Sequence, residues 1–302
     1  MNAGSRVAAA PISWGVSELA TWGLRLPAER VLSEMAAAGF GATELGPPGY
    51  LPEDPHACRE MLDRHGLRLV AGFLAVVLHE SRASALGEVG THAAELAAAG
   101  AEMLVLAAAL PGESYERHDE LTATQWRELL STLTACAAVA AGRGVKVSFH
   151  PHAGTAVESR DQVNRLLDAC DVDLCLDTGH LLLGGTDPVE LARRAGRRIS
   201  HVHLKDVDLD IATSVRAGEL SYSKAVRDGL YRPLGEGDLD VSAVVTALRD
   251  VGYQGWFVLE QDTALPAETE PADGPGAAAR QSLEYFRRID GAKQHITVGK
   301  EE

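Results

Sequence analysis

Basic residues are scarce in this chain, which carries 28 lysines and arginines against 43 aspartates and glutamates over 302 residues. The resulting formal charge of −15 argues against a nucleic-acid partner, because proteins that neutralise phosphates gather Lys and Arg. An acidic chain favours solubility and is compatible with collecting divalent cations. We therefore expect no nucleic-acid partner, and the endonuclease activity found in some barrel enzymes is disfavoured.

Cysteines and long apolar runs are few as well. The four cysteines, Cys58, Cys136, Cys170 and Cys175, form no Cys-x-x-Cys pair, which is typical of buried reduced thiols and not of a disulfide framework. No uninterrupted apolar run approaches the roughly 20 residues that span a bilayer. The first residues show no basic stretch followed by a long apolar one, as a signal peptide would. We expect a cytoplasmic protein with no membrane partner.

Strand-like apolar segments alternate with Ala-, Leu-, Arg- and Glu-rich helical segments along the whole chain. Such alternation predicts an α/β fold with a parallel sheet. Eight strand–helix units without a break in composition predict one (β/α)8 TIM-barrel domain over residues 1–302. The predicted strands are 7–12, 41–46, 67–73, 102–108, 145–150, 172–177, 199–204 and 255–260.

A doubly wound open sheet is the competing architecture, but no Gly-x-Gly-x-x-Gly follows the first predicted strand. Two segments fall outside the repeated units. The polar stretch at about 206–240 is interpreted as an extended loop over the active-site face. The end of the chain, at about 290–302, is interpreted as a flexible tail or as a segment that docks on a partner.

Metal-binding side chains stand at the ends of four predicted strands. Active sites of such barrels lie at the carboxyl ends of the strands, so these side chains are expected to converge. A mixed set of imidazoles and carboxylates suits Mn²⁺, Co²⁺, Zn²⁺ or Fe²⁺, and Mg²⁺ less well. The lack of cysteine among them argues against a structural zinc site. The residues are His150, His152, Asp177, His180, His203 and Glu260.

Each of these residues also has a simpler interpretation. A single histidine at a strand end is more often a hydrogen-bonded core or surface residue, and Asp177 can cap the turn that follows it. Four strands that all end in this way by accident are much less expected. Side chains alternate along a strand, so His150 and His152 face the same way and compete for one ligand position.

Several motifs together carry a resemblance to a known family. The chain resembles the xylose isomerase-like barrels of the sugar isomerase/epimerase superfamily, and is most similar to their inosose dehydratase branch. The resemblance covers nearly the whole chain. Its motifs are APISWG, AGFGATELGPPGYLP, FHPHAGTAVES, LDTGHLLLGG, HVHLKD, YRPLGEGDLD and GYQGWFVLEQD.

The resemblance implies a divalent ion, with Mn²⁺ or Co²⁺ favoured, held by His150, Asp177, His203 and Glu260. Many epimerases of the superfamily carry a glutamate before Asn-His where this chain has His150, Pro151 and His152. Those enzymes are understood to use two carboxylates on opposite faces of the sugar. Since only the Glu260 side keeps its carboxylate here, elimination of water is favoured over epimerisation.

The implied reaction is dehydration of a cyclic keto-polyol, with 2-keto-myo-inositol (an inosose) as the leading candidate in inositol catabolism. The metal would polarise the ketone, and a base of near-neutral pKa would remove the neighbouring proton. His152 is the predicted base. His180, Lys205 and Glu260 remain unranked candidates for the acid that protonates the departing hydroxyl.

Four further residues are candidates for contacts with substrate, each with an alternative. Trp14 is expected either to form an apolar wall for the ring or to pack in the core. Glu44 is a candidate to accept hydrogen bonds from sugar hydroxyls, or is a solvated loop carboxylate. Glu158 is either a substrate contact or a carboxylate that interacts with the N-terminus of the predicted helix that follows it. Arg232 lies in the long loop, either as part of a lid or simply in solvent.

Other functions stay open at this stage. The chain could be a metal-dependent keto-sugar isomerase or epimerase, or a lyase that cleaves a 3-keto glycoside by the same enolisation. A non-catalytic sugar-binding subunit is a further alternative, which predicts binding without turnover. In each case the partner is a small keto-polyol or keto-sugar. Because barrels of this kind are often dimers or tetramers, a homo-oligomer is compatible with the sequence.

Overall fold

Eight parallel strands close into a barrel in the order β1-β10-β7-β6-β5-β4-β3-β2, as the alternation of elements predicts. The computed structural model describes all residues except 1–5, 20, 113, 268–269, 271–273 and 298–302. Closure rules out the open doubly wound sheet. The strands are β1 Arg6–Ala9, β2 Ala42–Glu44, β3 Arg68–Val76, β4 Met103–Ala108, β5 Lys146–Phe149, β6 Asp173–Asp177, β7 Ile199–Leu204 and β10 Trp256–Leu259.

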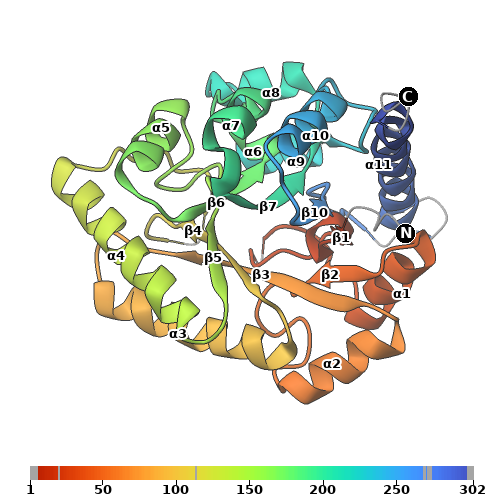
Figure 1. Ribbon diagram of the computed structural model, residues 1–302, viewed down its shortest axis with the longest axis horizontal. Helices are drawn as coiled ribbons and strands as arrows, with labels where there is room; N and C mark the ends of the chain where they lie inside the picture. Colours follow the sequence, from red (N-terminus) through yellow and green to blue (C-terminus); the bar gives the residue numbers. More distant parts are fainter. Residues whose placement is uncertain (1–5, 20, 113, 268–269, 271–273, 298–302) are drawn as a thin grey trace.

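Helices surround the barrel, and the first and last of them lie side by side (Figure 1). Because α11 packs against α1, the ring of helices around the barrel is closed. None of the described helices is long and apolar enough to cross a membrane. The outer helices are α1 Ala28–Ala38, α2 Pro55–Arg64, α3 Arg82–Ala99, α4 Ala123–Ala141, α5 Arg160–Ala169, α7 Pro188–Ala195, α10 Val241–Asp250 and α11 Pro275–Thr297.

Local sequence signals set the ends of α1. Pro27 precedes its first residue with extended backbone, and Gly39 follows its last residue with φ of 100°. That left-handed conformation favours glycine. The Gly39 N–H bonds back to Ala36 O and Met35 O, so the helix ends at this glycine.

Successive side chains along each strand point to opposite faces, so one apolar layer lies outside the barrel, beneath the helices, and a second lies inside it. Outward side chains such as Phe149, Leu176 and Leu204 join the large core beneath the helices. Inside the barrel, small residues form a separate cluster, to which Ala8 and Val258 belong. Because parallel strands present the same face at the same height, the polar residues further along them meet above this cluster.

The segment 206–240 is not an extended loop. It contains a two-stranded antiparallel sheet, β8 (Asp206–Val207) and β9 (Tyr231–Arg232), together with α8 (Leu209–Arg216) and α9 (Tyr222–Arg227). One buried carboxylate holds it together: Asp206 accepts backbone N–H bonds from Val207, Gly235, Gly237 and Leu239.

The end of the chain also differs from the expectation of a tail at 290–302. The last helix, α11, continues past Ile289 to Thr297. Inside it, the buried Phe286 ring packs against Phe257 of β10, with ring centroids 5.2 Å apart. Residues 298–302, the rest of the predicted tail, lie outside the described residues.

Candidate active site

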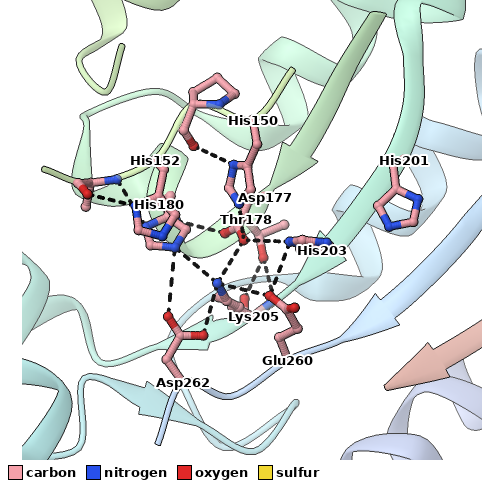
Figure 2. A network of polar contacts seen from close by, with 12 residues as sticks. His150, His152, Asp177, Thr178, His180, His201, His203, Lys205, Glu260 and Asp262 are labelled. Atoms are coloured by element: carbon pink, nitrogen blue, oxygen red, sulfur yellow. Dashed lines mark hydrogen bonds and ion pairs between the residues drawn. The ribbon is translucent and has the colours of Figure 1, made fainter. Parts of the chain in front are cut away.

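A cavity of about 290 Å³ opens at the carboxyl ends of the barrel strands. Polar side chains converge on it from the end of β2, from β7 and from the residues that follow β5, β7 and β10, together with residues from the loops above. Figure 2 shows their side chains pointing toward one another around Lys205. The polar residues that line it include Glu44, His150, His152, His203, Lys205, Glu260 and Asp262.

Three of the four predicted metal ligands come together at the bottom of this cavity. Asp177, His203 and Glu260 each place one ligand atom within 4.8 Å of the others. His203 Nδ1 lies 3.2 Å from Glu260 Oε2 and 3.5 Å from Asp177 Oδ2. The three residues end or follow β6, β7 and β10, so the barrel itself sets these distances.

His150, the fourth predicted ligand, lies next to Asp177 of this group. Its Nδ1 lies 2.8 Å from Pro151 O, an oxygen that can only accept, so Nδ1 carries the hydrogen. Burial lowers the pKa of His150 well below its usual value, which leaves the neutral ring with a bare Nε2. That nitrogen faces Asp177 Oδ2 at 3.6 Å. Two acceptors that face each other suit a cation between them.

Orphaned buried atoms support the fit of a metal ion. Asp177 Oδ2 and His203 Nδ1 are buried without a hydrogen-bond partner of good geometry. The other oxygen, Asp177 Oδ1, accepts the His180 N–H at 2.9 Å and caps α6 (Thr178–Leu183). Asp177 therefore fulfils the alternative capping role with one oxygen and leaves the second for the cluster.

Lys205 is the cation that the structure shows in this cluster. Its Nζ lies 3.0 Å from Asp177 Oδ2, 3.1 Å from Glu260 Oε2 and 3.1 Å from Asp262 Oδ1. Burial alone would lower the pKa of Lys205, but the three carboxylates raise it well above its usual value. Burial alone would also lower the pKa of His203, but Cys175, Glu260 and Glu44 raise it well above its usual value. The carboxylates of this cluster therefore favour cationic groups between them, which is the environment that a divalent cation needs.

The carboxyl group of Glu260 has a raised pKa. Burial raises this pKa to about 7, against the opposing effects of His203 and Lys205. Glu260 is therefore able to bind or release a proton near neutral pH.

His152 and His180 form a stacked pair beside the cluster, with ring centroids 3.7 Å apart. His152 Nδ1 lies 2.8 Å from Ala153 O and must donate, so the neutral ring keeps a bare Nε2. Burial lowers the pKa of His152 and thus favours this neutral form. His180 accepts the Ala153 N–H at Nδ1, and its Nε2 lies 3.1 Å from Lys205 Nζ.

The four predicted substrate contacts are placed differently. Trp14 lies in the core, where its indole N–H donates to Glu34 at 2.9 Å. Glu158 accepts the Gly154 N–H at 2.7 Å and so braces the loop that carries His152. The half-exposed Arg232 pairs with Asp208 at 3.0 Å. None of these three lines the cavity, whereas Glu44 does.

Sequence reasoning missed several residues that line the cavity. Asp262 lies two residues after Glu260, and the alternation that places His150 and His152 on one face would have indicated it. Trp22, and not Trp14, supplies the tryptophan. Tyr222 comes from α9, inside the segment interpreted as a loop, where no local signal pointed to the cavity.

Comparison with known proteins gives the same fold and names relatives. A family model described as "Xylose isomerase-like TIM barrel" matches residues 32–289. The chain is 33% identical over 300 residues to an inosose dehydratase of Geobacillus kaustophilus, with 94% of each chain covered. It is 35% identical over 301 residues to the rhizopine catabolism protein MocC of Rhizobium meliloti, covering 95% of this chain and 89% of that protein.

Solved structures extend the likeness in fold. An L-ribulose 3-epimerase superposes with a TM-score of 0.72 at 16% identity, with 99% of both chains covered. The IOLI protein, whose structure holds a zinc atom, superposes with a TM-score of 0.68 at 15% identity, covering 95% of this chain and 98% of that one. At these identities the likeness shows the fold alone.

The comparisons and the site support one coarse conclusion. Relatives named inosose dehydratase support an enzyme that acts on a small, sugar-like molecule. The buried carboxylates and imidazoles suggest a divalent metal site. The chain belongs to the xylose isomerase-like TIM barrel family.

Proposed function

We propose that this protein is a metal-dependent hydro-lyase that dehydrates a cyclic keto-polyol, with 2-keto-myo-inositol as substrate. One observation carries the proposal: His152, with a bare Nε2, lines the same small cavity as His203 and Glu260 of the metal-type cluster. A base and a cation site that share one cavity are what enolisation next to a ketone requires. The similarity to inosose dehydratases supports this substrate.

His150, Asp177, His203 and Glu260 would hold the divalent ion, Mn²⁺ or Co²⁺ by preference, with Zn²⁺, Fe²⁺ or Mg²⁺ as alternatives. When bound, the ion supplies a Lewis acid that polarises the substrate carbonyl. The donor set fits this task, since Asp177 Oδ2 and His203 Nδ1 are buried without a hydrogen bond of good geometry.

The proton transfers fall to the chain's own side chains. His152 Nε2 takes the proton from the carbon next to the ketone, and the electron pair of that C–H bond forms the C=C bond of an enolate as the carbonyl π pair moves to oxygen. When the carbonyl re-forms, this pair moves into a new double bond between the α and β carbons and the C–O bond of the β-hydroxyl breaks. The hydroxyl leaves as water with a proton from a general acid. The candidates for that acid, His180, Lys205 and Glu260, meet at Lys205 Nζ, which lies 3.1 Å from each of the other two.

Aromatic side chains would enclose the ring of the substrate. Phe73, Tyr115, Trp22 and Tyr222 line the cavity. Apolar faces of this kind stack on the C–H faces of a polyol ring and exclude bulk water. The hydroxyl of Tyr222 donates to Asp262 at 2.9 Å, which holds this ring in place above the cluster.

Product analysis tests the proposed reaction. The metal-reloaded protein is incubated with 2-keto-myo-inositol, and the product is identified by mass and absorbance. Loss of one water with a new conjugated chromophore is expected. A product of unchanged mass would overturn dehydration in favour of keto-sugar isomerisation or epimerisation. Binding without turnover would point to a sugar-binding subunit, and cleavage of a 3-keto glycoside to the related lyase.

A further inference from the structure

His203 uses both of its ring nitrogens, and they face opposite sides. Nδ1 faces Glu260 and Asp177 at 3.2 and 3.5 Å. Nε2 lies 3.0 Å from Glu44 Oε1. Glu44 ends β2, which lies across the barrel from β7, so the imidazole stands between two groups of carboxylates.

The same Glu44 oxygen has a second donor. His201, two residues before His203 on the same face of β7, places Nε2 2.7 Å from Glu44 Oε1. A carboxylate oxygen can only accept. Both histidines must therefore carry a hydrogen on Nε2 to make these contacts. Glu44 is only 3% exposed, so water does not compete for this oxygen.

We infer that Glu44 is a positioning residue that orients His203 for metal binding through Nδ1, and that it is not a substrate ligand. The inference rests on the proposed metal site. With the hydrogen held on Nε2, the lone pair of a neutral His203 is on Nδ1, the nitrogen that faces Asp177 and Glu260. Histidines that bind metals commonly donate their other N–H to a carboxylate in this way.

A second metal ion is not needed to explain the Glu44 side of His203. Glu44, His201 and His203 also form a group with metal-ligand spacing. However, two N–H donors at 2.7 and 3.0 Å already satisfy the shared oxygen of Glu44. The cluster on the Nδ1 side differs, because Asp177 Oδ2 and His203 Nδ1 are buried without a hydrogen bond of good geometry and contact charged groups of the cluster.

Affinity for zinc separates the positioning role from a substrate contact. The dissociation constant for Zn²⁺ is measured by competition with a chromophoric chelator for the wild type, Glu44→Gln and Glu44→Leu. Loss of an outer carboxylate partner typically weakens metal binding by about 10–100-fold. We expect that loss for Glu44→Leu, and rescue to within a few-fold for Glu44→Gln, whose carbonyl oxygen can still accept both N–H groups.

Glu18→Gln is the matched control, since Glu18 lines the same cavity and accepts from Tyr115 and Ser17, neither of which is a proposed metal ligand. Its zinc affinity should equal that of the wild type. If Glu44→Leu binds zinc as tightly as the wild type but shows a raised KM for substrate, Glu44 is a substrate ligand and the inference is wrong. If the wild type itself binds no zinc, the proposed metal site fails as well.

A crystal structure of the zinc-loaded wild type keeps the inference testable even if Glu44→Leu does not fold. The expected result is zinc at Nδ1 of His203, with Nε2 still hydrogen-bonded to Glu44. Zinc at Nε2, or a Glu44 side chain turned into the cavity toward solvent, would overturn the inference and leave the metal-dependent reaction standing.

Discussion

Neighbouring carbonyls decide what the two histidines after β5 can do. His150 and His152 each use Nδ1 to donate to a backbone carbonyl at 2.8 Å. Each neutral ring therefore keeps a bare Nε2, but these nitrogens meet different surroundings. That of His150 faces Asp177 Oδ2, whereas His152 stacks against His180 and lines the cavity. The geometry favours His150 as the ligand and His152 as the base.

The role of His152 gives a prediction at this scale. His152→Ala should lower turnover of 2-keto-myo-inositol by about 10²–10⁴-fold, the usual contribution of a general base. Affinity for the metal should stay within a few-fold of the wild type, because His152 is outside the ligand set. Steady-state kinetics and chelator competition measure the two quantities. His56→Ala, on the exposed surface of α2, is the control. Turnover near that of the wild type would show that another group is the base.

At the residue scale, positions could be predicted where an apolar run ends in a metal-type side chain. Such runs placed His150, Asp177, His203 and Glu260 at or near strand ends, and the structure brings the last three within ligand distance. Trp14 was named and Trp22 was overlooked, because both follow β1 outside the barrel strands, where no period of two orients a side chain. The partners of Glu44 come from β7, more than 150 residues away, and only the closed barrel shows them.

At the scale of elements, the segment 206–240 departs most from expectation. Its helices, α8 and α9, have 8 and 6 residues, too few for a clear helical period. Short helices of this kind depend on tertiary contacts for stability. Here a buried apolar cluster supplies them, which includes Ala212 of α8 and Tyr222 and Val226 of α9. Asp206 fixes the chain on either side of these helices, since each of its two oxygens accepts two backbone N–H groups. A Cβ on Gly237 would lie 2.3 Å from Asp206 Oδ1, which explains why the second glycine of LGEGD has no side chain.

Asp206→Asn should therefore destabilise the protein. The amide NH₂ cannot accept, so two buried backbone N–H groups lose their partner, each at a cost of about 1–3 kcal/mol. We expect the free energy of unfolding in urea to fall by about 2 kcal/mol or more. Asp228→Asn, which alters an exposed ion pair with Lys224 in the same segment, should change it by less than about 1 kcal/mol. Equal effects of the two substitutions would contradict the bracing role of Asp206.

For the whole molecule, the buried histidines of the outer core link stability to pH. His92 on α3 is buried, and its Nε2 has no hydrogen-bond partner. Burial lowers the pKa of His92, although Glu95 acts in the opposite direction. In the unfolded chain, His92 binds a proton below about pH 6.5, whereas in the folded protein it does so only at a lower pH. The contribution of neutral His92 to the free energy of unfolding is therefore complete above about pH 6.5 and is lost as the pH falls toward the lowered native pKa.

His92→Gln tests this linkage, since glutamine stays neutral throughout. The free energy of unfolding is measured by urea at about pH 7.5 and about pH 5.5, with chelator present. The loss on acidification should be smaller in the variant than in the wild type, whatever the absolute stabilities. An equal loss in both proteins would mean that His92 binds its proton alike in the folded and unfolded states.

The barrel itself was predictable because one rule repeats eight times. Outward apolar side chains such as Phe149 and Leu176 lie in the core beneath the helices, whereas alanines such as Ala8 lie inside the barrel, and the helices surround the strands (Figure 1). Closure then gathers the strand ends, so the site follows from the fold. The segment 206–240 escaped prediction because long-range packing, and not local pattern, determines it.

The central claim is that the cluster of Asp177, His203 and Glu260 holds a metal ion required for dehydration. The most direct measurement is the initial rate with 2-keto-myo-inositol, followed by absorbance, for protein stripped of metal and for the same protein reloaded with Mn²⁺ or Co²⁺. We predict no dehydration by the stripped protein and its restoration by either ion. Equal dehydration rates before and after reloading would contradict the account.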